Sequence, residues 1–201
     1  MRRFWILPAV LLLGLVACGP LPITVDLLPS LQEAGLAQDE FSFELDVPPG
    51  TDLSGQDFDL KLPDDDGMAF DVEPPTMPAT PASMVLDFSA LFDYQLDCVE
   101  GLGGYMTVGA YLAPDEDALW ESPLAGTEKR VELRDSDSLE LSGRASLTSE
   151  QMDAVLSGHA VLGVRVVSDE LEGKSSTNPS CKVTLSGDYQ IQKAVLEVRF
   201  F

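Results

Sequence analysis

Apolar and polar residues alternate along most of this chain. In the segment 41–47, apolar residues occupy every odd position and polar residues every even position. Successive side chains of a β-strand point to opposite faces, so this alternation predicts a half-buried strand. Similar alternating or continuously apolar stretches predict strands at residues 58–62, 68–72, 84–88, 94–99, 106–112, 128–133, 139–147, 160–167, 181–185 and 189–200.

The last of these stretches changes phase partway along. Tyr189 and Ile191 are odd-numbered, whereas the apolar residues from Ala194 to Phe200 are even-numbered. One extra residue in a strand moves all following side chains to the opposite face. The phase change therefore predicts a β-bulge near Gln192 and Lys193.

One segment has the signals of a helix. Thr148 and Gln151 have the spacing of a capping box, and Gly158 is suited to a left-handed C-terminal stop. Apolar residues between them form a short stripe at helical spacing. The sequence therefore predicts one short helix near 149–157.

Short strands, frequent turn signals and one short helix are typical of an antiparallel β-sandwich, immunoglobulin-like in general architecture. The expected turns include Asp64–Gly67, Gly101–Gly104 and Ser186–Asp188. We expect residues 40–201 to form a single domain. The proline-rich stretch Glu73–Pro81 is interpreted as a loop between the sheets, because the strands before it make too small a core to stand alone. A linker between two subdomains is the alternative.

The N-terminal residues have the order of an export signal. Two arginines precede the apolar run Phe4–Ala17, which is too short to span a bilayer. The residues Leu15–Cys18 resemble the lipobox, the cleavage and lipidation signal of bacterial lipoproteins. This resemblance implies that residues 1–17 are removed and that Cys18 carries acyl chains such as palmitate. An ordinary secretory signal with an incidental cysteine is the alternative.

The resemblance also implies a location. Gly19 follows Cys18 where a signal for retention in the inner membrane would place an aspartate. We therefore expect a lipid-anchored protein of the outer membrane, with the face of that membrane left open. Residues 18–39, which include three prolines, are interpreted as the acylated N-terminus and a tether.

The charge of the chain excludes some partners. Its formal net charge is -22, with 34 acidic and 12 basic residues. Such acidity argues against nucleic acid and against docking flat on anionic lipid, since both attract basic surfaces. Solubility accounts for the charge, and binding of a divalent cation or a basic partner is the sharper alternative.

The three cysteines divide into two groups. Cys18 is assigned to lipid by the resemblance, which leaves Cys98 and Cys181 in an exported chain. We predict a disulfide between them, either across the core or between neighbouring strands, because export favours oxidation. Two cysteines and one histidine do not have the ligand spacing of a zinc site.

Two acidic turns are the weak candidates for a metal site. Asp64, Asp65, Asp66, Asp135 and Asp137 supply the oxygen ligands that calcium prefers. Aspartate is also an ordinary turn residue, and neither segment matches an EF-hand loop. We therefore expect no cofactor, with calcium as the alternative.

No stretch carries a recognisable catalytic motif. His159, the single histidine, follows the predicted helix stop and is expected to lie in a loop rather than in a catalytic triad. The sequence therefore predicts no catalytic residues and a protein that is not an enzyme.

Three functional hypotheses follow, in order of preference. The first is a non-catalytic, lipid-anchored module that binds a protein or glycan of the envelope or has a structural role there. The second is a carrier of lipid or another hydrophobic ligand, which would need an apolar cavity. The third is an envelope hydrolase that uses acidic residues.

Overall fold

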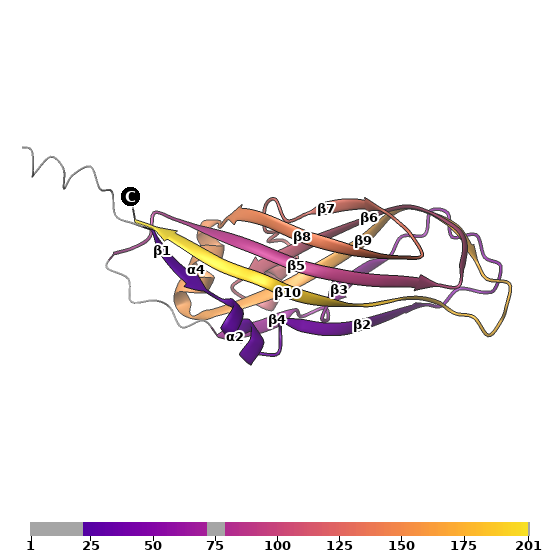
Figure 1. The fold of residues 1–201 in the computed structure, drawn as a ribbon, viewed down its shortest axis with the longest axis horizontal. Coiled ribbons are helices and arrows are strands. Elements are labelled where there is room, and N and C mark those ends of the chain that lie inside the picture. Colours follow the sequence, from indigo (N-terminus) through magenta and orange to yellow (C-terminus); the bar gives the residue numbers. More distant parts are fainter. Residues whose placement is uncertain (1–21, 72–78, 201) are drawn as a thin grey trace, which may run out of the picture.

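Two five-stranded antiparallel sheets pack face to face in the structure, a computed structural model that describes residues 22–71 and 79–200 (Figure 1). The order in sheet A is β1-β10-β5-β8, and β2 pairs with β10 beside β1. The predicted antiparallel β-sandwich is confirmed. Sheet A consists of β1 (Ile23–Asp26), β2 (Gln38–Leu45), β5 (Ser83–Asp97), β8 (Ser136–Ser146) and β10 (Val183–Arg199).

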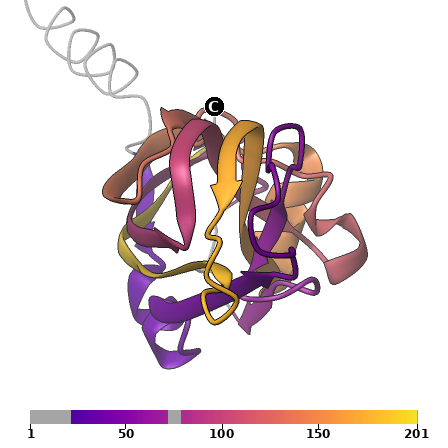
Figure 2. The same cartoon turned by 90° about the vertical axis from the view of Figure 1, so that its right-hand side faces the viewer.

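Sheet B has the order β3-β9-β6-β7, and β4 also pairs with β9. Figure 2 shows both sheets end-on, with the chain passing repeatedly from one to the other. Its strands are β3 (Asp59–Leu62), β4 (Met68–Asp71), β6 (Val99–Ala113), β7 (Lys129–Glu132) and β9 (His159–Ser175). The helices are α2 (Leu28–Glu33), α3 (Glu116–Leu119) and α4 (Ser149–Ser157).

The core lies between the two sheets and is made by alternate residues of each strand. Along β5, every even-numbered residue from Met84 to Leu96 is buried. One cluster of buried side chains contains residues of both sheets and of strands on both sides of segment 72–78. Burying each large aliphatic or aromatic side chain stabilises the fold by about 1.5–3 kcal/mol, so this cluster is the main source of stability.

The helix predicted near 149–157 is confirmed as α4. The Thr148 hydroxyl accepts a hydrogen bond from the Gln151 amide, and the Gln151 side chain accepts one from the Thr148 amide, which completes the capping box. Gly158 ends the helix with φ of 84°. The buried Gln151 Nε2 also donates to the carbonyl oxygens of Leu112 and Ser122, both at 3.2 Å, and so ties α4 to sheet B.

The predicted β-bulge is also confirmed. The pairing of β10 with β5 shifts register between Ile191 and Lys193. Tyr189 and Ile191 are buried before the shift, and Ala194 and Leu196 after it. The bulge keeps the apolar residues of a 17-residue strand on the core side.

Several strands are longer than predicted. Residues 84–88 and 94–97 belong to one strand, β5, because Ala90 and Phe92 continue its buried face, and Val99 begins β6. The apolar Leu91 lies on the outer face and hides this alternation in the sequence.

Two predicted turns are wrong. Gly101–Gly104 lies within β6, at two register shifts, and a Cβ on Gly104 would lie 2.3 Å from the Glu170 carbonyl oxygen. Ser186–Asp188 lies in the middle of β10, with β2 and β5 on either side. The chain turns instead at Cys98, whose φ is 65°. In β6 and β10, the glycines of the two expected turns permit close approach of neighbouring backbones rather than a change of chain direction.

The tether interpretation is wrong for the described part of residues 18–39. Ile23 to Asp26 pair with β10, and α2 follows directly. Leu27, Leu31 and Leu36 are buried in the core. Prolines do not prevent this structure, because Pro29 lies in the first turn of α2, where no backbone hydrogen bond is lost.

The start of β7 and the turn before it lie against β8. Lys129 Nζ donates to the Glu140 carbonyl oxygen at 2.8 Å. A Cβ on Gly143 would lie 2.5 Å from the Gly126 carbonyl oxygen, so the two backbones approach closely. Among the described residues, no helix is long and apolar enough to cross a membrane.

Candidate functional site

A shallow basin of about 490 Å³ lies on the outer face of sheet B. A volume in this range is typical of ligand sites. Neighbouring strands β6 and β9 supply most of its wall, since Thr107 lies opposite Val167 and Gly109 lies opposite Arg165. The lining mixes polar and apolar surface, and three of its nine residues are acidic: Asp57, Thr107, Gly109, Tyr111, Glu128, Arg165, Val167, Ser168 and Asp169.

Arg165 lines the basin, and two hydrogen bonds fix the position of its side chain. Its Nε and Nη2 atoms donate to the two carboxylate oxygens of Asp59 at 2.7 and 2.6 Å, a bidentate pair between β9 and β3. This hydrogen bonding lowers the pKa of Asp59 and raises the pKa of Arg165, so both stay charged. The pair holds the guanidinium group in place at the wall of the basin.

Aromatic side chains border the basin at one end. The ring centroids of Tyr111 and Trp120 are 5.5 Å apart, and Trp120 Nε1 donates to the Asp65 carbonyl oxygen at 2.6 Å. The small helix α3 positions Trp120 after Asp115 caps its first turn by accepting from the Ala118 amide. Helix α3 and Trp120 therefore pack on the outer face of sheet B.

Acidic groups surround the basin. Asp57 and Glu128 are exposed, and Asp169 forms an ion pair of 2.7 Å with Arg130. The Arg130 guanidinium also lies over the ring of Tyr105, 4.1 Å from its centroid. Carboxylates therefore outnumber the cations along this rim, and a positively charged ligand fits its electrostatics.

Other hollows of the described structure are less suited to a ligand. A larger hollow, of about 750 Å³, lies beside β1 and α2 and extends to Asp71. The apolar spaces between the sheets hold only about 10 Å³ each. That is little more than the smallest cavity that holds one water molecule.

The predicted disulfide is present. The Cα atoms of Cys98 and Cys181 are 5.7 Å apart. The bond lies in neither of the two expected places, because Cys98 forms the turn between β5 and β6 and Cys181 precedes β10. The bond therefore joins two connections at one end of the sandwich. Cys18 lies outside the described residues.

Of the calcium candidates, Asp64, Asp65 and Asp66 lie in a turn, Asp135 precedes β8, and Asp137 lies in β8. Asp64 accepts a hydrogen bond from the Asp66 amide, and Asp65 lies 3.3 Å from Lys61. Asp137 pairs with Arg134, and the carbonyl oxygen of Asp135 accepts from the Leu96 amide. In the part of the chain that the structure describes, no three histidine, cysteine, aspartate or glutamate side chains come together as a metal site.

His159 is not in a loop as predicted; it is the first residue of β9. Its Nδ1 lies 3.3 Å from an Asp71 carboxylate oxygen, and both side chains are exposed. The nearby Ser157 hydroxyl donates to the carbonyl oxygens of Ala154 and His159 rather than to the imidazole. The described surroundings of His159 contain no serine aligned for a triad.

The basin is not predictable from the local sequence pattern alone. The available signal was the outward set on β6, where threonine, glycine and tyrosine alternate with buried residues. This pattern does not show which strands lie beside β6. Asp59 and Arg165, for example, are 106 residues apart in the sequence.

Comparisons with known proteins identify no family. No family model matches the chain, and no curated protein matches it. Its fold resembles solved structures of viral capsids. An empty Triatoma virus capsid chain is 11% identical over 81% of this chain and 88% of its own, with a TM-score of 0.33. A deformed wing virus chain is 11% identical over 82% and 46%, with a TM-score of 0.36. An Israel acute paralysis virus chain is 13% identical over 81% and 90%, with a TM-score of 0.31. Similarity this low carries no functional argument.

Proposed function

We propose that this chain is a lipid-anchored protein of the bacterial cell envelope, on the outer membrane, that binds a basic segment of another envelope protein without catalysis. Cys18 carries the lipid, and the basin on sheet B is the binding site. The single observation that carries the binding role is the acidic rim of that basin.

The rim favours a cationic partner for two reasons. Asp57, Glu128 and Asp169 border one hollow, and only Asp169 has an ion pair among the described residues. The chain as a whole has a net charge of -22, which attracts basic partners from a distance. Lysine or arginine side chains would gain both charge and hydrogen bonds there.

A glycan ligand finds less support. Sugar rings commonly stack on open aromatic faces, but Tyr111 is only 8% exposed. Tyr105 is 40% exposed, and the Arg130 guanidinium already lies over its ring. We therefore place a protein partner before a glycan.

The carrier hypothesis finds less support as well. A carrier needs an apolar cavity large enough for an acyl chain or similar ligand. The described spaces between the sheets hold about 10 Å³ each. Side chains fill the interior instead.

A pull-down from gently solubilised native membranes tests the proposal. The baits are the intact lipoprotein, the variant Asp57→Asn/Glu128→Gln and the matched variant Asp93→Asn/Glu140→Gln. The matched pair removes the same charge from the outer face of sheet A. We expect the intact bait and the matched variant to retain one envelope protein that the basin variant loses.

Other results have definite meanings. Mass spectrometry of the mature N-terminal peptide should find acylated Cys18, and an unmodified cysteine would refute the anchor. Equal capture by both variants would refute the basin as the site. If the bait instead retained a glycan or a lipid, the ligand of the basin would be that molecule and not a protein.

A further inference from the structure

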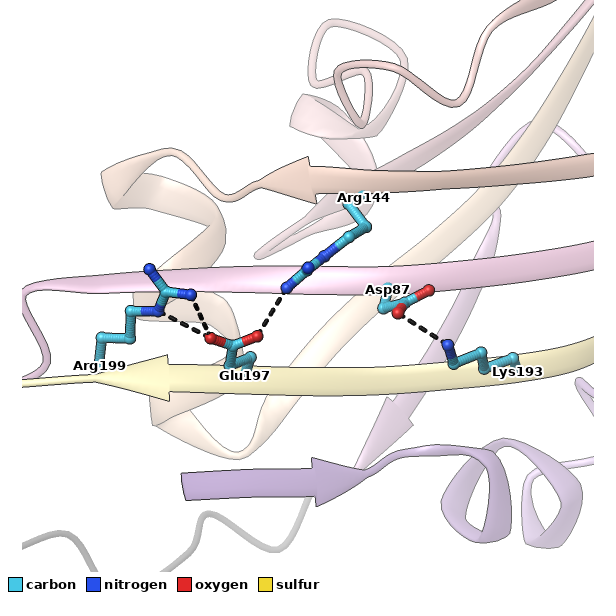
Figure 3. Close-up of polar contacts among 5 residues, drawn as sticks. All are labelled: Asp87, Arg144, Lys193, Glu197 and Arg199. Carbon is cyan, nitrogen blue, oxygen red and sulfur yellow. Dashed lines mark hydrogen bonds and ion pairs between the residues drawn. The ribbon is translucent and has the colours of Figure 1, made fainter. Parts of the chain in front are cut away.

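Two arginines share one carboxylate on the outer face of sheet A (Figure 3). Arg144 of β8 extends across β5, and its Nη2 lies 2.6 Å from a Glu197 carboxylate oxygen. Arg199 Nε donates to the other oxygen of Glu197 at 2.7 Å. The side chains of Arg144 and Arg199 are 57% and 54% exposed, so most of their donors remain free for another acceptor.

This cluster is the one ion-pair group of the described residues in which cations outnumber carboxylates. The neighbouring pair of Lys193 and Asp87, 2.7 Å apart, adds no net charge. Hydrogen bonds from Arg199 lower the pKa of Glu197, which therefore stays ionised. The cluster carries one net positive charge on a strongly acidic protein.

The cluster lies where the chain enters the sandwich. Ile23, at the start of β1, pairs with Val198, the neighbour of Arg199. We call this end of the sandwich the anchor end. Ile23 follows Cys18 by only five residue steps. At about 3.3–3.6 Å per residue, they can hold the anchor end no more than about 18 Å from a lipid on Cys18.

The far half of the same face has the opposite charge. Asp188 of β10 lies directly between Glu40 of β2 and Asp93 of β5. Asp188 is 11 residues from Arg199, so this acidic row lies about 35 Å from the anchor end. Charges so far apart act independently at physiological salt, because the Debye length is about 8 Å.

We infer that Arg144 and Arg199 bind phosphate groups of phospholipids in the leaflet that holds the lipid anchor. This inference rests on the proposed function, which supplies the anchor. The acidic row keeps the far half of sheet A away from the anionic surface, so the sandwich tilts instead of lying flat. Sheet B, with its basin, then faces away from the membrane.

The chemistry of both groups supports this contact. A guanidinium group has five N–H donors and binds phosphate oxygens in a bidentate manner. Because the lipid on Cys18 holds the protein at the membrane, the local concentration of headgroups is high. A weak interaction is then enough to set the orientation of the sandwich.

Residue-specific arginine labelling tests the inference. The acylated protein is reconstituted into vesicles of phosphatidylcholine with phosphatidylglycerol, into vesicles of a phosphate-free galactolipid, and into detergent micelles. A dicarbonyl reagent modifies arginine, and mass spectrometry gives the rate at each site. Arg134 is the matched control, because its side chain is 63% exposed and lies away from the anchor end.

We expect phospholipid vesicles to slow labelling of Arg144 and Arg199 about fivefold, the factor that corresponds to about 1 kcal/mol per arginine at an anionic surface. Labelling of Arg134 should not change, and added salt should remove the protection. Equal rates at all three arginines, or equal protection in galactolipid vesicles, would overturn the phosphate contact. Flotation with vesicles reports the anchor separately: a protein that floats without protection refutes this inference alone, and one that does not float refutes both proposals.

Discussion

The ring of Trp120 lies directly over Gly163 on the outer face of sheet B. A Cβ on Gly163 would lie 2.5 Å from Cη2 and 2.9 Å from Cζ3 of that ring. The absence of a side chain at Gly163 makes room for Trp120, whose ring packs against Tyr111 of the basin wall.

The substitution Gly163→Ala should displace this ring. We expect a loss of about 1–3 kcal/mol in the free energy of unfolding, as for overpacking elsewhere. Tryptophan emission should shift to longer wavelength, because Trp5 lies in the predicted signal peptide and Trp120 is then the single reporter. The control is Gly109→Ala, where the new Cβ would contact only flexible or ordinary neighbours, 3.0 Å or more away. An unchanged emission spectrum in Gly163→Ala would contradict the packing described.

Loss of the disulfide should lower stability strongly. Cys98 and Cys181 are separated by 83 residues, and a bond that closes so long a loop restricts the unfolded chain by about 4 kcal/mol. Urea unfolding of Cys98→Ser/Cys181→Ser should show this loss. Reductant should destabilise the wild type to the same level and leave the variant unchanged.

Alkaline pH should destabilise the fold through Tyr189. Burial raises the pKa of Tyr189 to about 12, whereas an unfolded tyrosine has a pKa of about 10. The folded state therefore retains the proton between these values while the unfolded state loses it. Stability is unaffected below about pH 10 and falls by up to about 2.7 kcal/mol as pH rises to about 12. Urea unfolding across this range should show the smaller loss in Tyr189→Phe, and equal losses would contradict the prediction.

Substitution of Gln151 should lower the free energy of unfolding more than substitution of Thr148, the other residue of the capping box of α4. Thr148→Ala removes one cap and should cost about 1 kcal/mol. Gln151→Ala also removes the donor that serves the carbonyl oxygens of Leu112 and Ser122, and should cost about 2–3 kcal/mol. The exposed Ser149→Ala is the control, with an expected change below about 0.5 kcal/mol. Thermal or urea unfolding gives the ranking.

Removing charge from the acidic row should stabilise the protein. Asp188→Asn relieves repulsion from both Glu40 and Asp93, so we expect a gain of about 0.5–1 kcal/mol at low salt that disappears at high salt. Asp93→Asn should gain less, and the double variant less than the sum of the two. Additive gains, or gains that salt does not change, would contradict this explanation.

Local patterns predicted the local features of the fold. The phase change near Gln192 gave the bulge of β10, and the spacing of Thr148 and Gln151 gave α4 with its capping box. Both depend on residues a few positions apart, whose side-chain directions are determined by the backbone itself.

Long-range packing decided the rest. Gly187 resembles a turn residue, but β2 and β5 flank it and hold it in an extended strand. Pro29 and its neighbours resemble a tether, but the buried Leu27 and Leu31 anchor them to the core. The basin is likewise a product of strand order, which places β3 and β6 on either side of β9. No local pattern contains that order.

The contacts of Gly126 and Lys129 with β8 bear on how copies of this protein meet one another. An unprotected edge strand is a template on which a neighbouring molecule can add its own strand. Lys129 already occupies the Glu140 carbonyl oxygen, and Gly126 fills the space under Gly143. With these two positions of β8 already in contact with Lys129 and Gly126, a second copy finds less exposed backbone there on which to add a strand.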